Sequence, residues 1–315
     1  MQPNLDKSNF TLTLLLIGAV SIPLVVDPVN SAQLILEIYA WIADQFGWLY
    51  AAAGIGALGL LCWLAFSRFG AIKLGQADET PEFTDLSWIA MLFSAGVGAG
   101  LMYWSAIEWS YYFESPPFAA EPYSVQAASW ASSYGMFHWG LTAWAFYCLP
   151  TLAIAYPFYR ERVPVLKYSL GCHYWLKGRE ESIPARVMDG LFMLALIGGA
   201  GSSLGFSTPL ISSLIARLTG IPAGFPLETG VVLLCVVIFA TSVYLGLEKG
   251  IKRLSDLNMV ASLLLLAFVV VAGPSLFIFK TSLNSLGTLL QNYISMSFWT
   301  DPFTDSGFFE EWTVF

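Results

Sequence analysis

Charged residues are scarce in this sequence of 315 residues. Only 11% of them are Asp, Glu, Lys or Arg, whereas 57% are hydrophobic, and the mean hydropathy is +0.65. A soluble globular domain carries about 25% charged residues. The shortage excludes a soluble domain and predicts an all-α polytopic membrane protein whose surroundings are the lipid bilayer. No nucleic-acid partner is expected.

Histidine and cysteine are also scarce, with two and four residues. A His-rich metal centre is excluded, and the lack of a His-Glu-x-x-His sequence excludes an intramembrane zinc protease. The cysteines are not paired by spacing, so neither a disulfide nor a metal site is expected. A serine hydrolase that uses Ser202 or Ser203 with His138 has only residue types in its favour. No enzyme activity and no catalytic residue are therefore predicted.

Long polar segments are lacking, and seven uncharged runs are each long enough to cross a bilayer. They are Ser8–Val26, Gly47–Ser67, Leu86–Ile107, Val125–Tyr159, Gly190–Ala216, Thr229–Leu247 and Leu257–Phe279. The membrane part of the fourth run is placed near Ser132–Tyr159. The first run lacks an Ala-x-Ala exit and is interpreted as a retained helix, not as a cleavable signal.

Basic residues are distributed unevenly between the two sides of these spans. With a cytoplasmic N-terminus, only Arg217 and Lys280 of the 14 Lys and Arg residues fall on the outer side. The positive-inside rule then predicts a multi-pass protein of the cytoplasmic (inner) membrane with its N-terminus in the cytoplasm. Part of the net charge of −8 comes from acidic residues in the outer loops.

Glycine recurs at alternate positions inside the third run, in Ser94-Ala95-Gly96-Val97-Gly98-Ala99-Gly100-Leu101. Glycine loosens a helix, and unwound backbone inside a membrane is tolerated where it is buried in protein or lines a cavity. Transporters place substrate and ion sites at such breaks. A dinucleotide-binding loop is excluded, because Leu101 occupies the third glycine position of that motif. Tight helix packing through small residues remains an alternative.

Aromatic residues are concentrated at the start of the fourth run. On one continuous helix Trp139, Ala143, Phe146 and Tyr147 fall close together, with Trp144 beside them. An aromatic face attracts a cation by about 0.5–2 kcal/mol, so several faces can enclose a quaternary ammonium group. Composition alone favours the alternative, an aromatic belt at the membrane interface or ordinary core packing.

Glu108 lies near the end of the third run and is followed by Tyr111 and Tyr112. Intramembrane carboxylates are costly and often functional. A hydrated, structural acceptor is an equally good interpretation of Glu108.

Near the end of the chain, apolar residues of Thr281–Ser297 recur at spacings of three and four, which predicts an amphipathic helix on the outer surface or packed against its neighbours.

The segment Met91–Met102, together with Phe137-His138-Trp139, Trp144 and Tyr147, resembles the betaine/choline/carnitine transporter family. The likeness extends over essentially the whole chain. The sequence from Ile107-Glu108-Trp109 through Pro116-Pro117-Phe118 and that from Phe137 to Gly140 are particularly similar to the carnitine/γ-butyrobetaine antiporter branch.

The resemblance implies the first half of a leucine-transporter-type inverted-repeat fold. Residues 1–85 would hold two additional N-terminal helices, residues 86–280 the first five-helix repeat, and residues 281–315 the amphipathic helix and the start of helix eight. Family members are typically homotrimers, and the amphipathic helix resembles the one used in trimer contacts. Because secondary transporters usually contain two repeats, the chain is expected to be a fragment.

The resemblance also implies site residues. The substrate site would comprise Trp139, Trp144, Tyr147, Tyr111, Gly98 and Gly100. A hinge would comprise Gly96, Gly98 and Gly100, and the backbone at Ser94 and Val97 would bind a coupling Na⁺. The other half of the substrate box lies on helix eight, after the end of the chain.

Coupling differs between branches of the family. In the carnitine branch an arginine on helix seven replaces the ion, and the matching position here is Asn258. A second sodium site found in some members uses two threonines, which match Leu196 and Ala200 here, so one cation site is expected. The predicted function is Na⁺-coupled uptake of a glycine betaine, choline or carnitine type of compound by alternating access. The alternatives are Na⁺-independent exchange of carnitine-like compounds and a non-transporting binding or sensor fragment.

Overall fold

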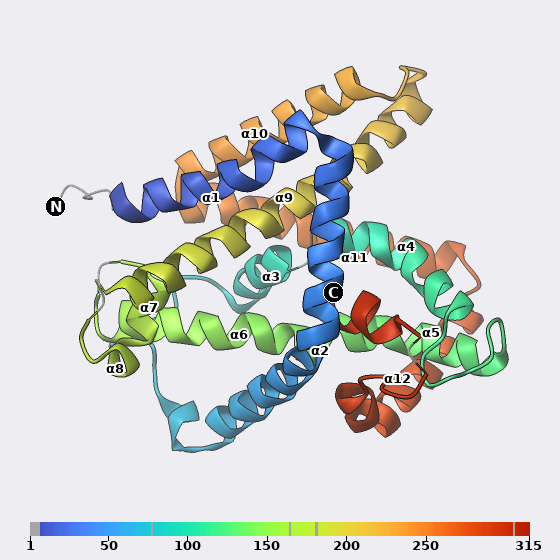
Figure 1. Cartoon of the computed structure of the whole chain (residues 1–315), viewed down its shortest axis with the longest axis horizontal. Coiled ribbons are helices and arrows are strands. Elements are labelled where there is room, and N and C mark those ends of the chain that lie inside the picture. Colours follow the sequence, from blue (N-terminus) through green and yellow to red (C-terminus); the bar gives the residue numbers. More distant parts are fainter. Residues whose placement is uncertain (1–6, 77, 97, 164, 180–181, 305) are drawn as a thin grey trace. The chain divides into compact units, whose positions relative to one another are not determined.

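The computed structural model describes residues 7–315 except residues 77, 97, 164, 180–181 and 305 and the side chains of Ser8 and Ala99. Every regular element in this described part is a helix, as the all-α prediction requires (Figure 1). The chain forms two compact units. Unit 1 comprises residues 1–79, 112–198 and 287–315, and unit 2 comprises residues 80–111 and 199–286.

The helices of the described part follow one another without a long unstructured insertion. They are α1 (Lys7–Val26), α2 (Pro28–Phe66), η1 (Arg68–Ala71), α3 (Asp85–Gly96), α4 (Ala99–Glu114), α5 (Val125–His138), α6 (Leu141–Ala155), η2 (Tyr156–Arg160), α7 (Tyr168–Gly171), α8 (His173–Leu176), α9 (Ile183–Thr219), α10 (Phe225–Gly246), η3 (Leu247–Ile251), α11 (Lys252–Ala272), α12 (Ser275–Phe298) and η4 (Phe309–Val314). The predicted amphipathic helix near residues 281–297 is therefore present, within α12.

Five helices of the described part are long and apolar enough to cross a membrane, or six if α3 and α4 are one bent span. Seven spans are expected from the sequence. The difference lies in Phe225–Ala272, which counts as one element of 48 residues. At 1.5 Å per residue it would measure about 70 Å, more than twice the hydrocarbon core.

That long element is interrupted at Gly246, where φ is 81° and ψ is −176°. A side chain on Gly250 would collide with the carbonyl oxygen of Ser242, so the chain turns tightly at this point. We therefore treat α10 and α11 as two segments. The repeat boundaries that the resemblance implies divide the chain differently from the two contact units and stay a prediction.

In unit 1, α1 and α2 meet at a corner (Figure 1). Asp27 caps α2, because its side chain accepts hydrogen bonds from the backbone and side-chain nitrogens of Asn30. The first half of α9 packs beside α1, where the Thr13 hydroxyl donates to the sulfur of Met193. The corner thus follows from a strong N-cap directly after an apolar helix.

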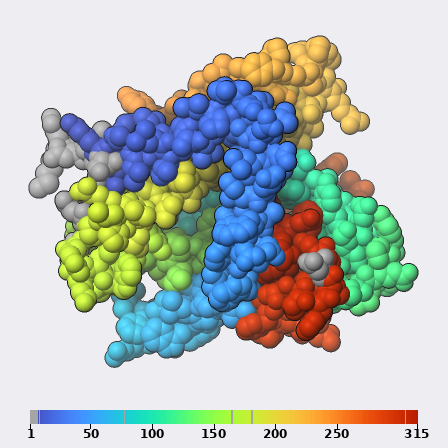
Figure 2. Space-filling view, in the orientation of Figure 1, coloured from blue at the N-terminus to red at the C-terminus, as the bar shows by residue number. Residues whose placement is uncertain are grey.

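Helix α2 is the element against which much of unit 1 packs. Gly54 lets α6 approach closely, since a Cβ at this position would lie 2.7 Å from a methyl carbon of Thr142. The Tyr39 hydroxyl donates to the carbonyl oxygen of Glu310 at 2.8 Å. Figure 2 shows the C-terminal segment, in red, beside α2, in blue.

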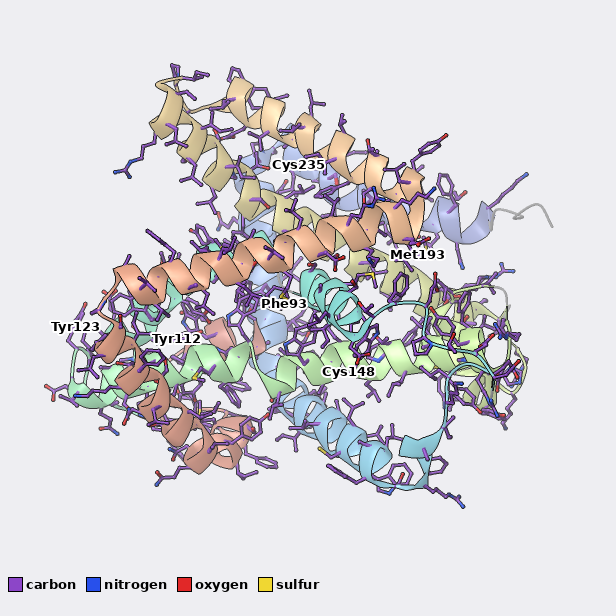
Figure 3. All side chains as sticks on the ribbon, turned by 180° about the vertical axis from the view of Figure 1, so that it is seen from behind. Phe93, Tyr112, Tyr123, Cys148, Met193 and Cys235 are labelled. Atoms are coloured by element: carbon purple, nitrogen blue, oxygen red, sulfur yellow. The ribbon has the colours of Figure 1, made fainter. Side chains whose placement is uncertain are left out.

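An aromatic cluster forms the core of unit 1. Its buried members are Tyr112, Ala131, Tyr134, Phe137, Met296 and Phe308. The rings of Tyr112 and Trp312 lie edge to face at a centroid distance of 4.9 Å, and those of Tyr134 and Phe308 at 4.9 Å. Such pairs add about 0.5–1.5 kcal/mol beyond their buried area. Figure 3 shows Tyr112 close to α5, where its ring meets those of Tyr134 and His138.

The connection between α6 and α9 is held by a buried carboxylate. Asp189 of α9 accepts from the Ser169 backbone nitrogen at 2.9 Å and from the Ser169 hydroxyl at 2.8 Å. Both residues are buried, at 5% and 0% exposure. Two hydrogen bonds to one charged group order this polar connection, since a buried carboxylate is costly without donors.

In unit 2, α3 packs along α11. The Ser87 hydroxyl donates to Asp256 at 3.2 Å, and Lys252 forms an ion pair with the same carboxylate at 3.4 Å. Further along the two helices, the Asn258 amide nitrogen donates to the Ser94 hydroxyl at 3.1 Å. These polar contacts fix the alignment of α3 on α11.

Candidate functional site

The glycine run is the place where the third apolar segment is interrupted. Helix α3 ends at Gly96, α4 begins at Ala99, and the two helix axes are bent by 61°. Gly98 lies between the helices and Gly100 in the first turn of α4. The predicted break is therefore present, and Val97, predicted to be a cation ligand, lies outside the described residues.

Gly98 is not required by steric crowding in this structure. A Cβ on Gly98 would lie 3.9 Å from the Ser203 hydroxyl oxygen, which is an ordinary contact, and within unit 2 a Cβ on Gly100 would meet nothing closer than 4 Å. Neither glycine has the positive φ that demands glycine. Within unit 2, close packing against neighbouring atoms therefore does not account for Gly98 and Gly100, and their role as a hinge stays a prediction.

Ser94 lies in the last turn of α3. The last four carbonyl groups of a helix have no partner within it, and the helix dipole makes that end negative. The Ser94 hydroxyl accepts from Asn258 of α11, so its side chain is held while its carbonyl belongs to the negative helix end. This arrangement suits a small cation better than an anion.

Tyr103, Trp104 and Phe206 form an aromatic cluster beside the glycine run in unit 2. The rings of Tyr103 and Phe206 are stacked at 5.4 Å, and Trp104 lies edge to face with both, at 5.2 and 5.7 Å. Phe206 was not predicted to belong to a functional site. No local pattern could have found it, because its partners are about a hundred positions earlier in the chain.

The predicted aromatic face of the fourth segment is partly wrong. Helix α5 ends at His138, and Trp139 is its C-cap, with φ −95° and ψ 6°. A side chain at Gly140 would collide with the carbonyl oxygen of Met136, so glycine permits the chain to leave the helix here. Trp139 therefore does not continue the helical face that includes Tyr147.

On α6 the rings of Trp144 and Tyr147 lie 5.8 Å apart and are tilted by 45°. Tyr147 is 56% exposed within the described structure. Phe146 instead packs toward α2, with a ring carbon 3.4 Å from the position of a Cβ on Gly54. Two of the four aromatic residues thus remain together, and Phe146 contributes to helix packing.

Tyr111 and Glu108 lie on α4. Tyr111 is 46% exposed, and it belongs to unit 2 with the glycine run, whereas Trp139, Trp144 and Tyr147 belong to unit 1. Glu108 is only 7% exposed and has interactions with neighbouring groups. This burial argues against hydration of Glu108, and its two interpretations, a functional carboxylate and a structural acceptor, both stay predictions.

His138 joins three elements of unit 1. Its Nδ1 atom lies 2.9 Å from the Tyr112 hydroxyl of α4, and its Nε2 atom lies 3.2 Å from the Thr313 hydroxyl of η4. A neutral imidazole donates through one nitrogen and accepts through the other, and both hydroxyls can take either role. His138, which directly precedes Trp139, is thereby held by hydrogen bonds to α4 and η4.

These features occur in a chain that matches one known family along almost its whole length. The profile described as BCCT, the betaine/carnitine/choline family transporter, matches residues 9–315. The chain belongs to the betaine/carnitine/choline transporter family. Members of this family are membrane transporters, not enzymes, which agrees with the helical, apolar architecture.

Individual members of the family show the same relationship. The chain is 34% identical over 252 residues to a carnitine transporter of Acinetobacter baumannii, covering 80% of this chain and 46% of the relative. It is 36% identical over 294 residues to the glycine betaine transporter OpuD of Bacillus subtilis, covering 92% and 57%. An uncharacterized Escherichia coli transporter, YeaV, is 36% identical over 260 residues, covering 82% and 53%. The chain thus spans about half the length of these relatives.

Proposed function

We propose that this betaine/carnitine/choline family protein takes up a small quaternary ammonium compound across the plasma membrane by alternating access. The observation that supports this most directly is the interruption of α3–α4 at the glycine run, inside a segment of membrane length. Broken helices present backbone groups and dipole ends to a substrate or ion. Backbone freedom at Gly96, Gly98 and Gly100 would let the two helix halves change their angle during transport.

The aromatic residues support an onium substrate. A trimethylammonium group has no N–H to donate, so aromatic faces can hold its charge without hydrogen bonds. Trp144 and Tyr147 form such a surface on α6, and we assign Trp139 of the same unit to the substrate site. In unit 2, we assign Tyr111 and the backbone at Gly98 and Gly100 to substrate binding. Relatives named as carnitine and glycine betaine transporters favour this substrate class.

For coupling we propose one Na⁺ that binds at the carbonyl end of α3, with Ser94 and Val97 as ligands. The neighbouring side chain is the neutral amide of Asn258, which donates to Ser94 and adds no positive charge that would repel an ion. Na⁺-independent exchange is the alternative, and the identity to a carnitine transporter gives it a basis.

Transport decides between the two modes. The chain, together with any continuation that its gene encodes, is reconstituted into proteoliposomes, and uptake of radiolabelled glycine betaine is measured with Na⁺ or K⁺ outside. We expect uptake to require Na⁺. Uptake that proceeds equally in K⁺ and depends on preloaded carnitine would establish exchange instead.

Trp144→Leu tests the aromatic site. It removes a ring that is paired with Tyr147, and we expect onium affinity to fall about tenfold, as cation–π energies of about 0.5–2 kcal/mol imply. The matched control is Trp48→Leu, at an exposed tryptophan of α2. If both variants bind onium like the unmodified protein while remaining folded, Trp144 serves packing alone.

The N-terminus is proposed to be cytoplasmic and the protein to be a homotrimer. Helix α12 exposes an apolar stripe that includes Leu283, Leu286, Leu290 and Ile294, which suits a subunit contact. Cross-linking of single-cysteine variants on this stripe in membranes would give trimeric products.

If the protein binds onium compounds without transporting them, the sensor alternative is the correct one.

A further inference from the structure

The connection between α6 and α9 in unit 1 is rich in basic residues. Six of the 14 Lys and Arg residues fall between positions 160 and 186, together with three Glu, so this stretch is net basic in a chain whose net charge is −8. Figure 1 shows its two short helices, α7 and α8, at the end of α6 and beside the first part of α9. With the cytoplasmic N-terminus proposed above, the stretch lies on the cytoplasmic side.

Two contacts hold α7 against the ends of two membrane spans. A Cβ on Gly171 would lie 2.4 Å from the carbonyl oxygen of Ala153, so α7 packs directly on α6. Ala153 lies about 10 Å of helix before Arg160, the first charged residue after the fourth apolar run. Ser169 donates to Asp189, the last charged residue before the uncharged run of α9. Both contacts therefore place α7 where the hydrocarbon core meets the headgroup region.

Helix α8 follows α7 after a single residue and has one buried and one open side. Leu176 is 7% exposed, whereas Tyr174 and Trp175 are 84% and 74% exposed in the described structure. Rings with that exposure gain little from core packing. Tyr and Trp are favoured at headgroup depth, because each ring is largely apolar and carries one polar group that can form a hydrogen bond.

A tight turn keeps two basic residues beside these rings. Lys177 and Gly178 have φ values of 53° and 74°, and the Arg179 backbone nitrogen donates to the carbonyl oxygen of Leu176 at 3.1 Å. The side chains of Lys177 and Arg179 are exposed, and neither forms an ion pair with another described residue. Two positive charges are thus available to an anion directly after the aromatic pair.

The combination of rings, charges and depth favours one kind of anion. A free phosphate ion would use the two positive charges but would gain nothing from Tyr174 and Trp175. An anionic phospholipid offers a phosphate to the basic residues and an apolar region to the rings. The contacts of α7 with α6 and α9 put both features at the depth where lipid headgroups are found.

We propose that α7, α8 and the turn after them form an interfacial anchor that binds an anionic phospholipid. Lys177 and Arg179 hold the lipid phosphate, and Tyr174 and Trp175 insert beside the ester region of the lipid. The anchor attaches the connection between α6 and α9 to the inner leaflet. It does not depend on the proposed function, because the transported compound takes no part in it.

The fluorescence of Trp175 tests this contact. The chain and Trp175→Phe are reconstituted into phosphatidylcholine bilayers with increasing fractions of brominated phosphatidylglycerol or brominated phosphatidylcholine, and the difference between the two proteins is the Trp175 signal. We expect half of this signal to be quenched at an about tenfold lower fraction of the brominated anionic lipid, as two basic residues near a membrane surface imply. Equal quenching by the two lipids, or quenching by neither, would overturn the proposal.

Charge variants show whether the preference arises at this site. Lys177→Gln combined with Arg179→Gln should abolish the preference for the anionic lipid, whereas the exchange of Lys177→Arg with Arg179→Lys should keep it. Arg217→Gln combined with Lys280→Gln removes two exposed charges elsewhere and should leave the preference unchanged. If this control lowers the preference as much as the first pair does, the net charge of the protein and not a site is responsible.

Three further results would identify a different occupant or none. The signal of Trp48, an exposed tryptophan of α2, is obtained with Trp48→Phe and should be quenched equally by both lipids; a preference equal to that of Trp175 would refute a specific site. If inorganic phosphate reduces the quenching of Trp175 more than chloride at the same ionic strength, the site binds a soluble phosphate compound instead. If the quenching of Trp175 is lost in the chain together with any continuation that its gene encodes, protein and not lipid covers α8.

Discussion

Replacing Tyr112 by Phe removes one hydroxyl from the hydrogen-bonded chain that joins α4, α5 and η4 in unit 1. Tyr112 is fully buried, and its hydroxyl lies 2.9 Å from Nδ1 of His138. The substitution keeps the ring, and therefore the edge-to-face contacts with Trp312 and Tyr134. Any loss of stability then reports the hydrogen bond and not a cavity.

The expected loss in the free energy of unfolding depends on the polar atom that is left without a partner when the hydroxyl is removed. A net hydrogen bond contributes about 0.5–1.5 kcal/mol, and a buried polar atom that loses its partner costs about 1–3 kcal/mol. His138 retains its contact with Thr313, so part of the imidazole stays satisfied. We expect the free energy of unfolding to fall by about 1–2 kcal/mol.

The assay is SDS-induced unfolding in mixed micelles, followed by far-UV circular dichroism. Tyr244→Phe is the control, because Tyr244 is 91% exposed on α10 and should contribute nothing to stability. Thr313→Val removes the other hydroxyl of the chain. The double variant should lose less than the sum of the single losses, because the two hydroxyls share one imidazole whose nitrogens take opposite roles.

An unchanged unfolding midpoint for Tyr112→Phe would refute this reasoning. It would mean that the hydroxyl is equally well satisfied without His138. A loss as large in Tyr244→Phe would show instead that the assay responds to any tyrosine hydroxyl.

The remaining predictions concern packing and pH. Gly54→Ala should lower the free energy of unfolding of unit 1 by about 1–3 kcal/mol, because the new Cβ overlaps a methyl group of Thr142. Gly56→Ala in the same helix is the control and should be neutral or slightly stabilising. Equal effects of the two substitutions in the SDS assay would argue against close packing of α2 on α6. Burial raises the pKa of Asp301, but hydrogen bonds outweigh burial and hold the pKa below its ordinary value of 3.8. The ionised Asp301 therefore stabilises the folded loop above pH 3.8, and this stabilisation is lost as the pH falls further and the carboxylate is protonated. Hydrogen exchange in residues 299–308 should therefore accelerate below about pH 4 in the unmodified chain and change less in Asp301→Asn, and parallel pH profiles would count against this assignment.

Features that depend on neighbouring residues could be predicted from the sequence. The interruption of the third segment was expected because three glycines recur between Ser94 and Leu101, and α3 does end at Gly96. The amphipathic pattern near residues 281–297 likewise lies within a helix. The break at Trp139–Gly140 was missed, although Gly140 was a local signal for it.

Contacts between distant positions could not be predicted in the same way. Phe206 stacks on Tyr103, and Thr313 contacts His138 across 175 positions, and no periodicity links such pairs. The loop of Asp301 left a weak signal, since an Asp followed by Thr304 and Ser306 is typical of a side-chain-capped turn.

The sequence by itself determined that this chain is a helical membrane protein, because burial in lipid demands long uncharged segments and satisfied backbone groups wherever those segments lie. The transporter family came from the resemblance of its motifs. Only the tertiary structure decided which aromatic residues serve a surface and which serve the core. Trp144 and Tyr147 remain paired on α6, while Phe146 packs on α2 and Phe118 lies between two tryptophans. The physical reason is that an aromatic side chain is the same whether it lines a binding site or packs in a core. Only the residues around it in the folded structure distinguish the two roles.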